Sequence, residues 1–215
     1  QGWWPLLGHQ GVNPTKTGSV TGYHPGDYSF PKDELQQFEI CLGAILTQNT
    51  SWPQVEKALH NLKRINSLSA KGIKKLSAGK LREVIKPAGY YNQKAKYIRE
   101  FIKFFERSEG IPSRTDVLGV KGVGNETADS ILLYAFKMPE FVIDAYTKRI
   151  FSRLGVISHS DSYESIKHLF EENLEKNLES YQEYHALIVE HAKRNCRSKP
   201  VCEGCVLGRI CEKRF

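Results

Sequence analysis

The sequence predicts an all-α protein with about ten helices. Apolar residues recur at spacings of three and four along most of the chain after residue 33, which is the period of a helix with one buried face. Alternating patterns typical of strands and hairpins are weak. The 215 residues are also enough to bury a hydrophobic core without disulfide bonds.

The first 33 residues form the irregular part of the chain. They are rich in glycine and proline, and their aromatic residues show no helical period (Trp3, Trp4, Tyr23, Tyr28 and Phe30). Such a segment is predicted to drape over a core or to line a pocket.

Helical periodicity follows this segment. It begins with Phe38, Leu42, Ile45 and Leu46 and continues with Val55, Ala58, Leu59 and Leu62. Ser77 is expected to cap a short helix that runs to Ile85. The other helical segments are predicted over residues 91–106, 128–135, 143–154, 163–174 and 178–196.

Four cysteines crowd the C-terminal end with the spacing C-x5-C-x2-C-x5-C: Cys196, Cys202, Cys205 and Cys211. They predict either a metal centre or two disulfides. A secreted disulfide protein spreads its cysteines over a small fold, whereas this chain has only Cys41 elsewhere, so we favour a metal centre. Zinc sites usually pair two close cysteine knuckles, and four thiolates also hold iron–sulfur clusters. The spacing favours iron–sulfur and leaves zinc as the alternative.

The chain is basic, with a formal net charge of +7 and an isoelectric point near 9.1. This charge favours an anionic partner, with nucleic acid first, and the alternative is a basic protein without such a partner. No apolar stretch approaches the ~20 residues of a membrane span, and no signal peptide is visible. We therefore expect a cytoplasmic, nucleoid-associated protein of a prokaryote.

A glycine-rich turn over residues 118–128 joins two predicted helices. Gly122 and Gly124 suit a backbone with positive φ or one that closely approaches a ligand. The turn leads into a helix N-terminus, where free N–H groups favour phosphate, and Lys121 adds positive charge. The alternative is an ordinary turn between helices with glycine at a helix end.

Several motifs in the same order resemble the helix-hairpin-helix DNA glycosylases of the endonuclease III superfamily. They are Leu46-Thr47-Gln48-Asn49-Thr50, Gly89-Tyr90-Tyr91-Asn92-x-Lys94-Ala95, Gly122-Val123-Gly124-x-x-Thr127-Ala128, Ile143-Asp144 and the four cysteines. Glu126 precedes Asp144 by eighteen residues, the spacing between the lysine of the family's lyases and its key aspartate. The resemblance covers about residues 36–215.

The resemblance implies a six-helix barrel over residues 34–137 and a second helical domain made of residues 1–33 and 138–215. Double-stranded DNA would bind between them, to a monomer. The family's [4Fe–4S] cluster would be held by the four cysteines of residues 196–211. The first gap between cysteines is five residues here and usually six in the family, which affects the local loop shape.

The resemblance also implies residue roles. DNA binding falls to Gln48, Tyr90, Lys121, Gly122, Gly124, Thr127, Arg197 and Lys199. Gln48 would fill the hole that a flipped base leaves, and Tyr90 would act as a wedge. Without the motif context we would read Gln48 as an amide satisfied inside the helix bundle and Tyr90 as a core aromatic. For Arg197 and Lys199, which a rigid cluster would hold against phosphates, the alternative is solvated charges.

Asp144 is the expected catalytic residue. Cleavage of an N-glycosidic bond builds positive charge on the sugar, which a fixed carboxylate stabilises. The residues alone favour a helix cap at this position, and both roles are compatible. Glu126 stands where lyases carry their Schiff-base lysine, so we expect a monofunctional glycosylase, with Lys121 and Lys148 as substitute amines. Alternatives are a bifunctional glycosylase/AP lyase and an inactive DNA-binding module.

The target base is less well defined by the sequence. Trp3, Trp4, Trp52 and Tyr146 resemble the 3-methyladenine glycosylase branch, in which aromatic residues wall the base pocket. Glu126 is a further pocket residue or simply suits the first helical turn. Electron-poor alkylated purines stack well on indole, but the tryptophans also suit a core. The insertion between Pro5 and Phe38 departs from that branch, and it is compatible with hypoxanthine, uracil or mismatched thymine as the target.

Overall fold

The computed structural model of the chain describes residues 4–15 and 18–213. These ranges hold ten α-helices, two short helical turns and a single isolated β-bridge between Val12 and Thr21, which confirms the all-α fold. The elements are α1 (Glu34–Thr47), α2 (Trp52–Arg64), α3 (Ala70–Lys75), α4 (Ala78–Val84), η1 (Lys86–Ala88), α5 (Tyr91–Phe105), α6 (Arg114–Leu118), α7 (Asn125–Ser130), η2 (Ile131–Ala135), α8 (Ala145–Leu154), α9 (Tyr163–Asn173) and α10 (Leu178–Arg194). Within the described ranges, no helix combines the length and apolar character needed to cross a membrane.

Most helices begin at a side chain that caps them. Ser77 accepts a hydrogen bond from the N–H of Lys80 and starts α4, as predicted. Equivalent caps start α1, α3, α6, α9 and α10: Asp33, Ser69, Ser113, Ser162 and Asn177. Each such cap satisfies a backbone donor that the helix cannot pair and contributes about 1 kcal/mol. The short polar residues between apolar runs therefore determine where the helices begin.

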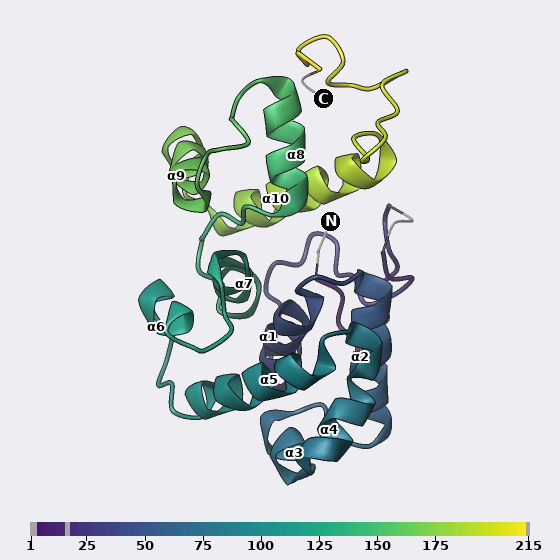
Figure 1. Cartoon of the computed structure of the whole chain (residues 1–215), viewed down its shortest axis with the longest axis vertical. Helices are drawn as coiled ribbons and strands as arrows, with labels where there is room; N and C mark the ends of the chain where they lie inside the picture. The colour runs from purple at the N-terminus through teal and green to yellow at the C-terminus, as the bar shows by residue number, and fades with distance from the viewer. Residues whose placement is uncertain (1–3, 16–17, 214–215) are drawn as a thin grey trace.

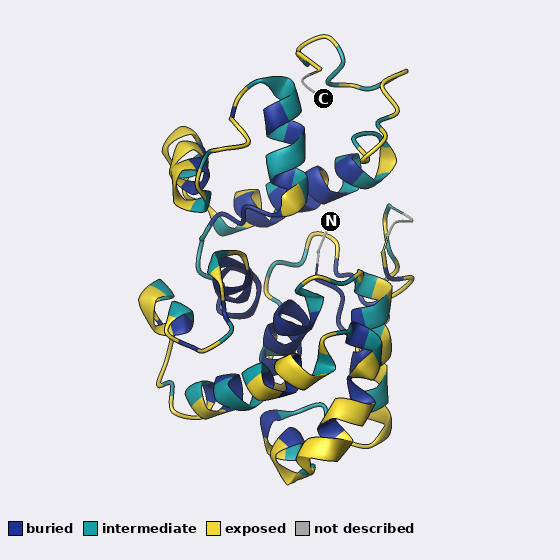
Figure 2. Cartoon of the chain, viewed as in Figure 1, coloured by how far each residue is buried: buried dark blue, intermediate teal, exposed yellow. Residues whose placement is uncertain are grey.

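Helices α1 to α5 lie at one end of the molecule, α8 to α10 lie at the other, and α6 and α7 lie between them (Figure 1). The centre of the first group is α1, whose residues 38–46 are all buried, as the dark ribbon in Figure 2 shows. A helix that is apolar all round requires neighbours on every side. Here α2, α5, α7 and η2 pack around it.

The N-terminal segment connects the two ends of the molecule. Its Leu7 N–H donates to Glu39 of α1 at 2.7 Å, and the carbonyl oxygen of Leu7 accepts from Lys63 of α2 at 2.9 Å. On the other side, Arg194 of α10 donates to the carbonyl oxygen of Thr15 at 2.7 Å. The segment drapes over the helical core as the sequence predicts, although it contacts both groups of helices. The division into residues 34–137 and 1–33 with 138–215 stays a prediction.

A buried ion-pair network joins the hairpin helices to α9. Asp129 of α7 has no exposed surface and accepts hydrogen bonds from the Arg114 guanidinium at 2.6 Å and from the Tyr163 hydroxyl at 2.8 Å. A buried carboxylate requires such partners because no water solvates it. The network therefore sets the position of α7, which starts next to the glycine-rich turn, relative to the C-terminal helices.

Candidate active site and cysteine centre

Asp144 caps α8 and is almost completely buried. One carboxylate oxygen, Oδ1, accepts hydrogen bonds from the backbone N–H of Thr147 at 2.7 Å and from its hydroxyl at 2.8 Å. The other oxygen, Oδ2, lies 3.5 Å from Nε2 of His185 on α10. The helix cap that the residues alone favoured is therefore present, and it leaves the second oxygen directed at another element.

The surroundings of Asp144 favour its ionised form. Burial alone would raise the pKa of Asp144, but the hydrogen bond and charge of His185 and the two bonds from Thr147 outweigh it, so the pKa lies below its usual value. A buried carboxylate that stays negative at neutral pH is the group that a developing positive charge on a sugar requires.

Glu126 supplies a second carboxyl group nearby, in the first turn of α7. The residue as a whole is exposed, yet enough protein lies around its carboxyl group to desolvate it. This desolvation, together with the negative charge of Asp144, raises the pKa of Glu126 to about 7. Two neighbouring carboxyl groups with pKa values pushed apart are typical of sites that perform acid–base chemistry.

An aromatic chain continues from this carboxylate pair. The buried Tyr134 hydroxyl lies 2.7 Å from Nδ1 of His185, and the Tyr134 ring lies 5.1 Å from the ring of Trp4. Trp4 meets the edge of Trp52 at 5.6 Å, and the Trp52 indole N–H donates to the Ser19 hydroxyl at 2.6 Å. Residues from the N-terminal segment, α2, η2, α8 and α10 therefore meet in one continuous cluster.

The predicted pocket residues fall into different environments. Trp4 is only 6% exposed and its indole lies close to Gly43 of α1, so it also serves the core. Trp52 is partly exposed, and Tyr146 carries the Arg149 guanidinium over its ring at 5.0 Å. Trp3 lies outside the described residues.

Sequence reasoning missed Tyr134 and His185, for which the only signal was a hydroxyl and an imidazole within otherwise apolar helical stretches.

Gln48, at the end of α1, contacts the glycine-rich turn. Its side-chain amide donates to the carbonyl oxygen of Gly122 at 3.0 Å and to the Thr127 hydroxyl at 3.1 Å. The amide nitrogen thus has acceptors within the protein, which agrees with the alternative interpretation. Its role in DNA stays a prediction. These bonds hold the end of α1 against the turn.

The two glycines of the turn differ in what they require. Gly122 has a φ of +90°, and a Cβ atom there would lie 2.2 Å from the Tyr97 ring of α5. Gly124 has an extended backbone with a φ of −97°, and a Cβ atom there would meet nothing within 4 Å. The first glycine is explained by internal packing. The second is the N-cap of α7, a position that glycine favours over alanine, and the open space beside it also suits close approach of an external ligand. Lys121 beside them is exposed.

The loop before α5 projects Tyr90 into solvent. Tyr90 has a positive φ of 44° and is 67% exposed, so it is not the core aromatic that the residue alone favoured. Behind it, the buried Lys94 ammonium donates to the carbonyl oxygens of Leu46 and Ala88 at 2.8 and 2.7 Å. Lys94 thus joins the end of α1 before Gln48 to the loop that carries Tyr90. Burial lowers the pKa of Lys94 to about 8.

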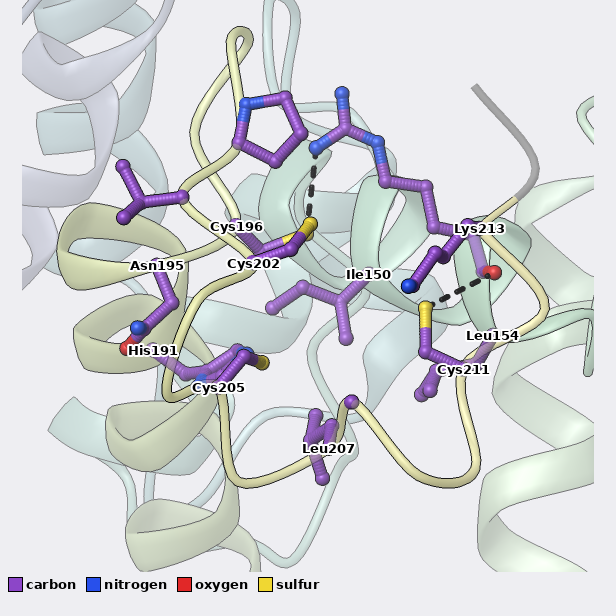
Figure 3. A pocket seen from close by; sticks show the side chains of 14 residues that line it. Ile150, Leu154, His191, Asn195, Cys196, Cys202, Cys205, Leu207, Cys211 and Lys213 are labelled. Atoms are coloured by element: carbon purple, nitrogen blue, oxygen red, sulfur yellow. Dashed lines mark hydrogen bonds between the residues drawn. The ribbon is translucent and has the colours of Figure 1, made fainter.

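All four C-terminal cysteines are free thiols that line one cavity, around Ile150 in Figure 3. The guanidinium of Arg153 on α8 donates to the Cys196 sulfur at 3.3 Å and to the carbonyl oxygen of Arg197. Arg149 donates to the carbonyl oxygen of Cys196 at 2.8 Å. The helix that Asp144 begins therefore also holds the first cysteine loop.

This loop carries the two cations predicted to bind DNA. Arg197 and Lys199 are both exposed on it, and the Arg197 side chain donates to the carbonyl oxygen of Lys193 at 2.9 Å. Among the residues described, no three His, Cys, Asp or Glu side chains are close enough to hold a single metal ion.

Comparison with known proteins agrees with this geometry. Residues 42–176 match the family described as HhH-GPD superfamily base excision DNA repair protein. The chain is similar to MJ1434 of Methanocaldococcus jannaschii, inferred to be a DNA repair glycosylase, with 49% identity over 187 residues that cover 81% of this chain and 85% of the relative.

Solved structures share the fold. An endonuclease III in a non-covalent complex with DNA superimposes with a TM-score of 0.74 at 22% identity, covering 82% of this chain and 83% of that one. A 3-methyladenine DNA glycosylase of H. pylori bound to 1,N6-ethenoadenine gives a TM-score of 0.64 at 29% identity, covering 78% of this chain and 92% of that one.

Proposed function

Because the chain belongs to the HhH-GPD superfamily of base excision DNA repair proteins, we propose that it is a monofunctional glycosylase that releases alkylated purines such as 3-methyladenine. It is a DNA glycosylase of the endonuclease III superfamily, an enzyme that hydrolyses N-glycosyl bonds, and DNA is its partner. The monofunctional mechanism, the alkylated purine and the site residues are the proposal.

The observation that carries the proposal is the pair of carboxyl groups, Asp144 and Glu126, beside the aromatic cluster. A base must leave the helical stack before its bond to the sugar can be attacked. As the base departs with the bonding electrons, the ionised Asp144 stabilises the positive charge on the sugar. Water then adds to the sugar carbon and loses a proton, which leaves an abasic site.

The absence of strand cleavage follows from Glu126. A lyase forms a Schiff base between a lysine amine and the sugar, and a carboxyl group cannot form one. Two other amines lie near enough to act electrostatically on the carboxyl pair: Lys148 on Glu126 and Lys193 on Asp144. Burial lowers the pKa of Lys193, so this residue joins Lys121 and Lys148 as the amines to test for residual lyase activity.

The alkylated purine is supported by the Trp4–Trp52 contact and by the H. pylori 3-methyladenine glycosylase. Alkylated purines are electron-poor and stack favourably on indole. The second candidate is hypoxanthine, uracil or mismatched thymine. It is favoured by the hydrogen bond from Trp52 to Ser19, because this bond brings the N-terminal insertion against the predicted pocket.

The proposal includes a [4Fe–4S] cluster held by Cys196, Cys202, Cys205 and Cys211. Four thiols around one cavity are the donor set that such clusters use, and the Arg153 cation beside Cys196 offsets part of the thiolate charge. When bound, the cluster would fix the loop that carries Arg197 and Lys199, which are expected to contact phosphates. Zinc is the alternative.

The test is a panel of duplexes with single lesions: a 3-methyladenine analogue, hypoxanthine, uracil, a G·T mismatch and thymine glycol, each assayed with and without hot alkali. We expect purine release, with strand breaks only after alkali. Breaks without alkali, or an adduct trapped by borohydride, would make the enzyme bifunctional. Loss of activity in Asp144→Asn with unchanged DNA binding would exclude an inactive binding module, since Asn keeps the helix cap.

A further inference from the structure

We infer that His185 is a positioning residue of the glycosylase reaction, which orients Asp144 through Nε2 and is itself held by the Tyr134 hydroxyl. This inference rests on the proposed role of Asp144. His185 belongs to α10, forty-one residues after Asp144, and is 4% exposed.

The two oxygens of Asp144 are used differently. Oδ1 is occupied by the two hydrogen bonds from Thr147, both within α8. Oδ2 makes its contact with a separate element, at 3.5 Å from Nε2 of His185. The helix cap by itself supplies no hydrogen-bond donor to Oδ2. His185 therefore supplies a hydrogen-bond donor to Oδ2, the oxygen that remains available for the reaction. Capping of the helix does not require this donor.

The contacts to Tyr134 and Asp144 together indicate which imidazole nitrogen carries hydrogen. Its hydroxyl lies 2.7 Å from Nδ1, and Tyr134 is 2% exposed. If the hydroxyl donates to Nδ1, the hydrogen of a neutral imidazole is on Nε2, and a charged imidazolium also has one there. The remaining tautomer would direct a lone pair of Nε2 at the Asp144 carboxylate, which is repulsive. We assign an Nε2–H group facing Oδ2.

The other charged groups explain why this donor matters. Glu126 from α7 repels Asp144, and Lys193 from α10 attracts it, while Tyr134 is the titratable group on η2. Two neighbouring carboxyl groups compete for one proton, as coupled acids do. The charge of His185 lowers the pKa of both carboxyl groups, but its hydrogen bond goes to Asp144, which directs the shared proton to Glu126. Asp144 is then negative when the sugar becomes positive.

Two substitutions separate this role from packing. His185→Gln places an amide donor near the position of Nε2, whereas His185→Asn places it near Nδ1 and withdraws it from Asp144. We expect His185→Asn to shift the acid limb of the single-turnover excision rate upward by about one pH unit, a loss of about tenfold on that limb, with unchanged DNA affinity. We expect His185→Gln to restore most of the wild-type profile. Tyr134→Phe should give a smaller shift in the same direction.

The assay uses the full-length protein and the lesion duplex that it cleaves fastest. A wild-type pH profile in His185→Asn would overturn the inference, and so would an equal loss at every pH in both the Asn and Gln variants, which indicates packing alone. Full activity of Asp144→Asn would instead refute the proposed role of Asp144, and no cleavage of any duplex would refute the proposed function.

A measurement without catalysis covers variants that fail to fold. Nitrogen-15 NMR of the wild-type imidazole reports which nitrogen carries hydrogen. We expect a hydrogen on Nε2 of His185 in the free protein. A neutral imidazole protonated only on Nδ1 would overturn the inference, because Nε2 would then present a lone pair to Asp144.

Discussion

Alanine at each glycine of the turn separates the cost of folding from the cost of binding DNA. In Gly122→Ala the new methyl group would lie 2.2 Å from the Tyr97 ring, on a backbone with a φ of +90°. In Gly124→Ala it would point into open space, on an extended backbone. Each variant adds one methyl group, at positions two residues apart in the same turn, so each is the control for the other.

The magnitudes follow from these geometries. A left-handed backbone costs an alanine about 1–2 kcal/mol, and relieving the overlap with Tyr97 adds about 1–3 kcal/mol. For a chain of 215 residues, in which each kcal/mol shifts the melting temperature by roughly 2–4 °C, Gly122→Ala should therefore lower it by roughly 4–20 °C. Gly124→Ala loses only the helix-capping preference of glycine, about 1 kcal/mol or less. If DNA phosphate lies against Gly124, the methyl group should weaken binding about tenfold, or ~1.4 kcal/mol.

Circular dichroism melting and fluorescence anisotropy with a labelled duplex measure the two costs separately. The expected result is a large melting shift for Gly122→Ala, and a small one with weakened DNA binding for Gly124→Ala. Wild-type affinity of Gly124→Ala would refute the placement of DNA against this backbone. An unchanged melting temperature of Gly122→Ala would show that α5 and the turn move apart without cost.

Three further predictions concern charge and ligation. Lys121→Gln should reduce the slope of log affinity against log salt by about 0.9, the contribution of one phosphate, and an unchanged slope would mean that Lys121 does not contact DNA. Because burial lowers the pKa of Lys94 from 10.5 to about 8, the unfolded chain binds more protons between those values, so the unfolding free energy should rise with pH by up to about 3 kcal/mol. Urea titrations at several pH values should show this rise in the wild type and not in Lys94→Met. Cys202→Ser should remove the absorbance near ~400 nm that a cysteine-ligated iron cluster gives, and a retained band would exclude Cys202 as a ligand.

The features that sequence reasoning found are those encoded by nearby residues. Ser77 and Asp144 bond to backbone groups three positions away, and the positive φ of Gly122 is a local property of the turn. The four cysteines lie within sixteen positions of one another. A short stretch of chain contains both partners of each of these interactions, so their spacing is sufficient to predict them.

The contacts that only the tertiary structure decided join residues far apart in the chain. Tyr134 meets His185 across 51 positions, and the Lys94 ammonium reaches the carbonyl oxygen of Leu46 across 48. Nothing in the spacing of these residues encodes the contact, because it arises when separately formed helices pack. By itself the sequence determined where the helices and the turn lie, that the four cysteines are grouped, and that Asp144 begins a helix. Packing decided which imidazole faces that aspartate and which lysine joins the loops of Gln48 and Tyr90, since burial forces each polar group to find a partner wherever the fold provides one.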